Sequence, residues 1–305
     1  MSLRIAIPDL VSPSYFPLIA AVELGCFRDE GHDAKLDLVF PVTRTYEMLR
    51  DGALDLAGGS AHAALYAFPD WRGGQLVCAL AQQMYWFLVL KTSLGAARGD
   101  LGAVRGLRIG AAPGPVDGLK GMLAHAGIDP TQDVTIGPVP GTIGGSGPVS
   151  FGLMAAKALE EGRIDGFWAN GMGAELAVRG GYGTVVIDAR RDGPGEAKGY
   201  TFPALVATSR MLAERPEVVH AGARAVRRAQ RLLAEDPGRA TAVGQRVFPP
   251  VEAELIAELV RRDAPFYDAG VSRETFDRMN RFAASMGLVQ QPGRYEDVVV
   301  DGAGR

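Results

Sequence analysis

The chain has 305 residues, of which 47% are apolar and 22% are charged, and its formal net charge is −3. This composition is typical of a soluble globular protein, and the length leaves room for two lobes with separate cores. The nearly balanced charge argues against a nucleic-acid partner. The one arginine-rich stretch, at 224–231, has the spacing of a solvated helix face.

No run of eighteen apolar residues occurs, so the sequence predicts no membrane span. No secretory signal precedes the first strand, which leaves two locations open: periplasmic or otherwise extracytoplasmic after removal of a signal, or cytoplasmic. Cys26 and Cys78 are too few for a disulfide framework and are predicted to be free and buried. The four histidines are scattered without ligand spacing, so we expect no metal and no cofactor.

The first third of the chain alternates strands with helices of about ten residues. This alternation indicates βαβ units and a largely parallel sheet. Strands are predicted at 4–8, 33–40, 54–58 and 75–82, and helices at 15–24, 43–50 and 61–68.

The pattern restarts after a strand at 87–91, which we expect to cross into a second lobe. A strand at 202–208 then returns to lobe one. Between them, strands are predicted at 107–111, 134–139, 166–169 and 184–188, helices at 118–126, 150–161 and 174–178, and a glycine-rich loop at 140–147. Helices follow at 217–233, 238–245, 251–262 and 274–285 and are expected to pack on lobe one.

These crossings predict a discontinuous lobe one, residues 1–84 and 203–305, and a lobe two of residues 85–202. The chain is expected to cross between the lobes near 83–87 and 199–204. Two such crossings allow the lobes to move as a hinge.

An internal repeat supports two similar lobes. Residues 51–60, Asp-Gly-Ala-Leu-Asp-Leu-Ala-Gly-Gly-Ser, return at 161–170 as Glu-Gly-Arg-Ile-Asp-Gly-Phe-Trp-Ala-Asn, and residues 3–8 correspond to 107–112. Each copy of the longer segment has a helix end, a glycine turn, a short apolar strand and a small polar residue. Two such lobes imply a cleft between their strand ends, suited to a small molecule.

Ligands of open parallel sheets bind beyond the carboxyl ends of the strands, so the loops there hold the candidate contacts. Ser60 and Asn170 end the repeated strands, and each can also cap the next helix. His62 is either structural or a ligand contact. Aromatic residues near the hinge either pack between the lobes or form a pocket wall. The predicted ligand contacts are Ser14, Tyr15, Phe16, Thr43, Ser60, His62, Tyr85, Trp86, Pro113, Trp168, Asn170 and Phe202.

No catalytic residue is assigned, because the chain has no Gly-x-Ser-x-Gly elbow, no evident carboxylate pair and no cysteine–histidine pair. The single catalytic role that the sequence suggests is that of a general base for His62. The glycine-rich loop lacks the lysine of a phosphate-binding P-loop.

Residues 23–31, Glu-Leu-Gly-Cys-Phe-Arg-Asp-Glu-Gly, resemble the helix–Gly–x–Phe–x–x–Glu–Gly opening of ABC-importer substrate-binding proteins of the nitrate/sulfonate/taurine group. The same superfamily includes binders and a synthase of the thiamine pyrimidine precursor. Residues 51–55 and 107–110 resemble its other recurring segments. Cys26 stands where a second aromatic residue is frequent, and the cysteine-rich iron-binding stretch of the synthase has no counterpart.

The resemblance implies a type II periplasmic-binding fold: two α/β lobes, each a mostly parallel sheet flanked by helices, with the C-terminal helices on lobe one. It also implies ligand contacts at Tyr15, Thr43, Ser60 and Asn170.

The expected function is that of a monomeric solute receptor. It would close on a planar, aromatic, carboxylate-bearing or sulfonate-bearing ligand and dock on an ABC permease. The alternative is a cytoplasmic enzyme on the same fold, a decarboxylase or dehydratase of small aromatic or cyclic acids.

Overall fold

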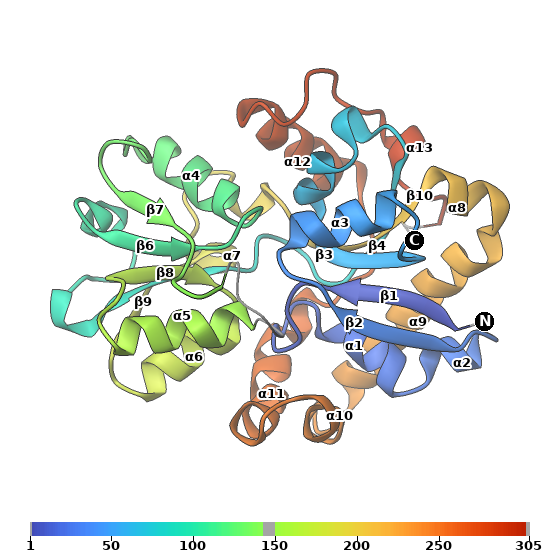
Figure 1. Ribbon diagram of the computed structural model, residues 1–305, viewed down its shortest axis with the longest axis horizontal. Helices are drawn as coiled ribbons and strands as arrows, with labels where there is room; N and C mark the ends of the chain where they lie inside the picture. The colour runs from blue at the N-terminus through green and yellow to red at the C-terminus, as the bar shows by residue number, and fades with distance from the viewer. Residues whose placement is uncertain (1, 143–149, 303–305) are drawn as a thin grey trace.

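Two five-stranded sheets form the centres of two lobes (Figure 1). The structure is a computed structural model that describes residues 2–142 and 150–302. Lobe one has the strand order β2-β1-β3-β10-β4, and lobe two has the order β7-β6-β8-β5-β9. The strands are β1 (Leu3–Ile7), β2 (Ala34–Leu38), β3 (Leu56–Ser60), β4 (Gly74–Ala79), β5 (Phe87–Lys91), β6 (Arg108–Ala111), β7 (Thr135–Gly137), β8 (Gly166–Ala169), β9 (Gly183–Asp188) and β10 (Pro203–Thr208).

The two sheets have equivalent topologies. In each, four strands run parallel and one runs antiparallel: β10 pairs antiparallel with β3 and β4, and β5 does the same with β8 and β9. Both antiparallel strands have an irregular register, between Leu205 and Val206 and between Leu88 and Val89. This arrangement confirms the predicted α/β class, and it makes β3 and β8 the equivalent strands of the sequence repeat.

The repeat extends to side-chain contacts at the outer ends of the sheets. The Asp55 carboxylate accepts a hydrogen bond from the backbone N–H of Arg4 at 2.7 Å, and Asp165 accepts one from the N–H of Arg108 at 3.0 Å. Each aspartate also forms an ion pair with the side chain of the same arginine. The aspartate of the repeated Gly-x-Leu/Ile-Asp segment therefore ties the start of one strand to its parallel neighbour.

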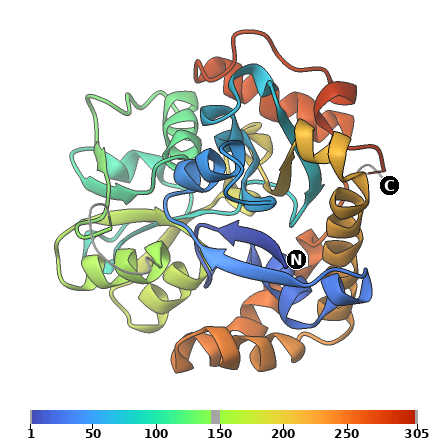
Figure 2. The same ribbon diagram turned by 45° about the vertical axis from the view of Figure 1, so that its right-hand side comes forward.

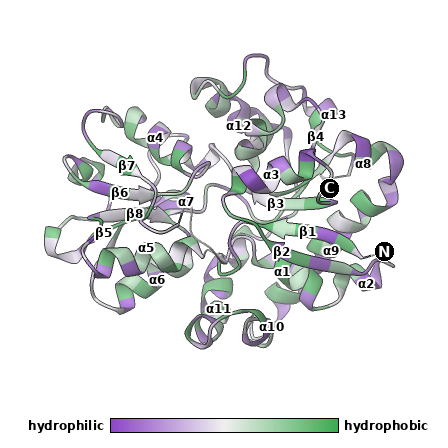
Figure 3. Cartoon of the chain, viewed as in Figure 1, coloured by the Kyte–Doolittle hydropathy of each residue, from purple (hydrophilic) through white to green (hydrophobic). Residues whose placement is uncertain are grey.

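Helices surround both sheets (Figures 1 and 2). Those after β10 lie on lobe one, as predicted, although α11 also lies beside α6 of lobe two. Figure 3 shows that outer helices such as α5 and α12 carry both hydrophilic and hydrophobic residues, as expected of helices with one buried face. The helices are α1 (Phe16–Glu23), α2 (Cys26–Asp29), α3 (Val42–Arg50), α4 (Val116–His125), α5 (Phe151–Glu160), α6 (Gly171–Arg179), α7 (Ala189–Asp192), α8 (Ser209–Glu214), α9 (Pro216–Glu235), α10 (Arg239–Val247), α11 (Pro250–Asp263), α12 (Arg273–Ser285) and α13 (Tyr295–Val298).

One hydrophobic cluster runs through both lobes by way of the hinge, where Tyr85 and Trp86 are almost completely buried. Cys26 and Cys78 are free and buried in this cluster, as predicted. Within the described residues, no helix has both the length and the apolar composition needed to cross a bilayer.

The structure differs from the sequence predictions in its short elements. The helix predicted at 61–68 is a 3₁₀ helix, Ala61–Tyr66, and Ser60 does not cap it. The four-residue helices α2, α7 and α13 and the six-residue helix α8 were not predicted, because so few residues carry no periodic signal. Residues 143–149 of the predicted glycine-rich loop lie outside the described residues. The lobe boundaries at 84/85 and 202/203 fall in the connectors between the sheets and stay predictions.

Candidate functional site

A pocket lies between the two lobes, beyond the carboxyl ends of β1, β2, β6 and β8. Its walls come from both lobes and from the hinge residues between β4 and β5. The cavity volume is about 40 Å³, room for only a few water molecules. The lobes are therefore nearly closed on each other here, and an organic ligand enters this space only as they move apart.

Aromatic rings form much of the wall. Tyr15 and Tyr85 meet edge to face with their ring centroids 5.5 Å apart, Trp86 adjoins Tyr85 at 4.5 Å, and Trp168 adjoins Trp86 at 5.9 Å. The indole N–H of Trp168 donates to the carbonyl of Pro115 at 3.0 Å, which fixes the plane of its ring. The hinge and both lobes thus share one continuous aromatic surface.

Two further rings stack across the pocket. Phe40 follows β2 in lobe one, and Phe151 begins α5 in lobe two. Their centroids lie 5.9 Å apart and their planes differ by 13°. Because both residues line the pocket, separating the lobes would break this stack.

Asp9 joins the lobes through its carboxylate. It follows β1 in lobe one and is only 6% exposed. Its oxygens accept hydrogen bonds from three groups of lobe two: the hydroxyl of Ser150 at 3.0 Å, the amide side chain of Asn170 at 2.7 Å and the backbone N–H of Gly152 at 3.4 Å. A fourth bond comes from the backbone N–H of Val11. Burial raises the pKa of Asp9 to about 6, although these hydrogen bonds favour the charged form.

Ser12 offers an unused polar group to the pocket. Its side chain is 1% exposed, and its hydroxyl oxygen has no hydrogen-bond partner among the described residues. A buried hydroxyl without a partner is costly, so it favours a ligand that supplies one. The hydroxyls of Tyr15 and Tyr85 bond to each other, and burial raises the pKa of both.

His62 lies outside the pocket wall and bridges the lobes in another way. Its Nδ1 is 2.9 Å from the hydroxyl of Thr201, and its Nε2 is 3.1 Å from the carbonyl of Gly114 and 3.5 Å from the carboxylate of Asp117. Tyr66 donates to that carboxylate at 2.9 Å. Both ring nitrogens are thus occupied within the protein.

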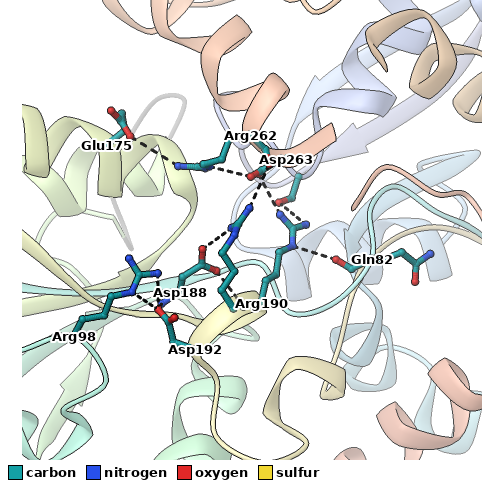
Figure 4. A network of polar contacts seen from close by, with 10 residues as sticks. Gln82, Arg98, Glu175, Asp188, Arg190, Asp192, Arg262 and Asp263 are labelled. Carbon is teal, nitrogen blue, oxygen red and sulfur yellow. Dashed lines mark hydrogen bonds and ion pairs between the residues drawn. The ribbon is translucent and has the colours of Figure 1, made fainter. Parts of the chain in front are cut away.

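A third set of polar contacts joins the lobes near α7 and α11 (Figure 4). Arg190 is 1% exposed and forms an ion pair with Asp263 at 3.2 Å, and it donates to the carbonyl of Gln82 at 3.1 Å. Arg262 pairs with Asp263 at 3.0 Å and lies 3.8 Å from Glu175 of α6. These ion pairs favour the closed arrangement, since opening would separate Arg190 from Asp263.

Six of the predicted ligand contacts line this pocket and six do not. The first group is Tyr15, Tyr85, Trp86, Pro113, Trp168 and Asn170. In the second group, the hydroxyl of Ser14 accepts a hydrogen bond from Arg190, and Thr43 lies within α3. The side chains of Phe16 and Phe202 belong to the hydrophobic core. The group is completed by Ser60 and His62, which are both buried. Asn170 also caps α6, its side-chain oxygen accepting from the N–H groups of Met172 and Gly173.

The pocket wall also contains Asp9, Phe40 and Phe151, which were not among the predicted contacts. Asp9 and Phe40 each come shortly after a strand, so their positions were a usable signal. For Phe151 the sequence offered no such signal, because it begins a helix that follows the glycine-rich loop.

A family profile described as "NMT1/THI5 like" matches residues 12–240, about three quarters of the chain. The chain belongs to this family. No curated protein sequence matches it.

Solved structures similar to this NMT1/THI5-like chain include two binding proteins. One is the alkanesulfonate-binding protein SsuA from Xanthomonas axonopodis pv. citri bound to MOPS, with 15% identity, a TM-score of 0.75 and coverage of 98% of each chain. The other is the periplasmic nitrate-binding protein NrtA from Synechocystis PCC 6803, with 12% identity, a TM-score of 0.74 and coverage of 99% of this chain and 86% of that one. At these identities the likeness establishes a two-lobed periplasmic-binding fold.

The desulfurization enzyme DSZB shares the fold as well, with 14% identity, a TM-score of 0.65 and coverage of 98% of this chain and 97% of that one. The fold of the family therefore hosts both binding and catalysis, and the function has to be argued from the pocket.

Proposed function

We propose that this chain is a solute-binding protein of an ABC importer, which closes its two lobes around a small organic ligand. The observation that carries the proposal is the pocket itself: both lobes and the hinge contribute to its aromatic wall, and buried polar bridges hold the lobes together around it. A ligand that touches both lobes stabilises the closed form by its contacts with each.

The similar structures support this reading, since SsuA and NrtA are named as binding proteins for alkanesulfonate and nitrate. On the same grounds we propose an extracytoplasmic location and a membrane permease as the partner. We also propose that the protein acts as a monomer, because the pocket is completed within one chain. Light scattering after size-exclusion chromatography tests this last point.

The test of the binding function is native mass spectrometry of the purified protein, followed by thermal-shift screening of small organic compounds. A compound that binds only the folded protein raises the melting temperature, by an amount that grows with its concentration over Kd. A compound recovered unchanged supports a receptor.

Two matched variants locate the binding site. Trp168 and Trp71 are both buried, and the indole N–H of each donates to an oxygen, that of Pro115 at 3.0 Å and that of Asn280 at 2.9 Å. Only Trp168 lines the pocket. Trp168→Phe should reduce the ligand-induced shift, whereas Trp71→Phe should lower the basal melting temperature and leave the shift unchanged. Equal shifts in both variants would place the ligand elsewhere.

A second candidate function is catalysis on a small aromatic or cyclic acid. The observation in its favour is a buried carboxyl in the pocket, Asp9, whose pKa is raised to about 6, together with the likeness to DSZB. Against it, the ring nitrogens of His62 are occupied by Thr201 and Gly114, outside the pocket. Consumption of the stabilising compound, with appearance of product, would favour the enzyme over the receptor.

A further inference from the structure

The pocket wall, as far as the structure describes it, has a negatively charged side chain and no positively charged one. Among the described residues that line the pocket, Asp9 is the one with an ionised side chain at neutral pH, and no arginine, lysine or histidine belongs to the wall. A ligand with a full negative charge would therefore find no cationic side chain in this wall.

Lobe two does have hydrogen-bond donors of the kind that bind anions. The hydroxyl of Ser150, the backbone N–H of Gly152 in the first turn of α5 and the side-chain amide of Asn170 converge on one point. A helix N-terminus with added side-chain donors is a usual binding site for a carboxylate or a sulfonate.

In this protein a carboxylate of the chain already occupies these donors. Asp9 Oδ1 accepts from Ser150, and Asp9 Oδ2 accepts from Gly152 and Asn170. With the bond from Val11, the carboxylate accepts four hydrogen bonds, which is close to its full capacity. An anionic ligand would have to displace Asp9 from these donors or lie against its negative charge.

We propose that the pocket selects planar aromatic solutes that are neutral or cationic and rejects carboxylates and sulfonates, because Asp9 occupies the anion-binding donors of lobe two. This inference rests on the proposed binding function and narrows its ligand class. The rings of Tyr15, Tyr85, Trp86 and Trp168 add to the preference, since aromatic faces attract cations and stack on planar molecules.

The test uses four benzene derivatives of similar size and shape: benzamidinium, benzamide, benzoate and benzenesulfonate. Affinities for the purified full chain are measured at pH 7.5 by tryptophan fluorescence and by isothermal titration calorimetry. Wild type should bind benzamidinium or benzamide about tenfold or more tightly than benzoate or benzenesulfonate. Equal or tighter binding of the two anions would overturn the inference while leaving the binding function intact.

Asp9→Asn removes the charge and keeps the shape. It should reduce the preference for the cation over the anions by about tenfold. The matched control is Asp117→Asn, which also removes a buried carboxylate between the lobes but one that does not line the pocket. An unchanged preference in Asp9→Asn, or an equal loss in both variants, would contradict the assignment to Asp9.

Two further outcomes are decisive. If Asp9→Asn does not fold, the ranking of the four compounds by wild type still tests the inference. If no compound of any charge class binds wild type at millimolar concentration, the inferred aromatic ligand class is overturned, and the binding function is judged separately by the thermal-shift screen.

Discussion

Gly114 provides a direct test of lobe closure. It lies in the loop after β6 of lobe two with φ +87°, and a Cβ atom there would come within 2.6 Å of Val42 Cγ1 and 3.3 Å of Ala63 Cβ, both in lobe one. Gly114→Ala therefore obstructs the contact between the lobes. Crowding of this kind costs about 1–3 kcal/mol, so closure and ligand affinity should weaken by about 5- to 150-fold.

The matched control is Gly127→Ala. Gly127 has a similar left-handed conformation, φ +72°, but a Cβ atom there would meet no other atom within 4 Å. Both variants carry the strain of a left-handed L-residue, about 1–2 kcal/mol, and only Gly114→Ala carries the clash. Their difference therefore isolates closure from backbone strain.

Small-angle scattering measures closure without any ligand, because separated lobes have a larger radius of gyration. The radius should increase in Gly114→Ala and stay at the wild-type value in Gly127→Ala. Once a ligand is known, its Kd provides the second measurement. If the two variants have the same radius and the same affinity, the contact of Gly114 with Val42 and Ala63 does not control closure.

Three other predictions concern charged groups. Asp263→Asn leaves Arg190 buried without its partner and should lower the free energy of unfolding, measured in urea, by about 3–5 kcal/mol. Because burial raises the pKa of Asp9 from 3.8 to about 6, the folded state keeps a proton that the unfolded state loses; the stability of wild type relative to Asp9→Asn should fall by roughly 3 kcal/mol between about pH 3 and pH 7 and change little above. The ion pair with Arg108 holds the pKa of Asp165 well below its usual range, so Asp165→Asn should cost about 1 kcal/mol at pH 7, a value discounted for solvent screening. That cost should disappear as the pH falls below about 4 and through the lowered pKa.

Each of these has a contrary result. A loss below about 1 kcal/mol in Asp263→Asn would mean that Arg190 finds another partner when folded. An identical pH dependence of wild type and Asp9→Asn would mean that this carboxyl titrates alike in both states. A cost in Asp165→Asn that is as large at pH 2 as at pH 7 would assign its role to packing.

The strands of both sheets could be predicted from the sequence, because the repeated segment contains a residue with the same structural role in each lobe. Asp55 and Asp165 recur since each accepts the backbone N–H at the start of the neighbouring strand, and the spacing to that strand is the same in both lobes. The aromatic wall was also predictable in part, because Tyr85, Trp86 and Trp168 stand near strand ends and the hinge.

The polar bridges between the lobes were not predictable. Asp9 and Asn170 are 161 residues apart, and nothing in the local pattern around either indicates which side chain of the other lobe it meets. His62 illustrates the same limit: its position after a strand suggested a ligand contact, but its partners, Thr201 and Gly114, are set by how the lobes pack.

The antiparallel strands have a consequence for how such a protein can change over evolution. All of lobe two's strands lie in one continuous stretch, and its first and last strands are neighbours, with Phe87 paired to Asp188. On the lobe one side, Ala79 is likewise paired to Ala204. The two entry points are thus side by side, so the second lobe has the geometry of an inserted module. A recombination event could exchange it as one cassette and replace half of the pocket without breaking the other half.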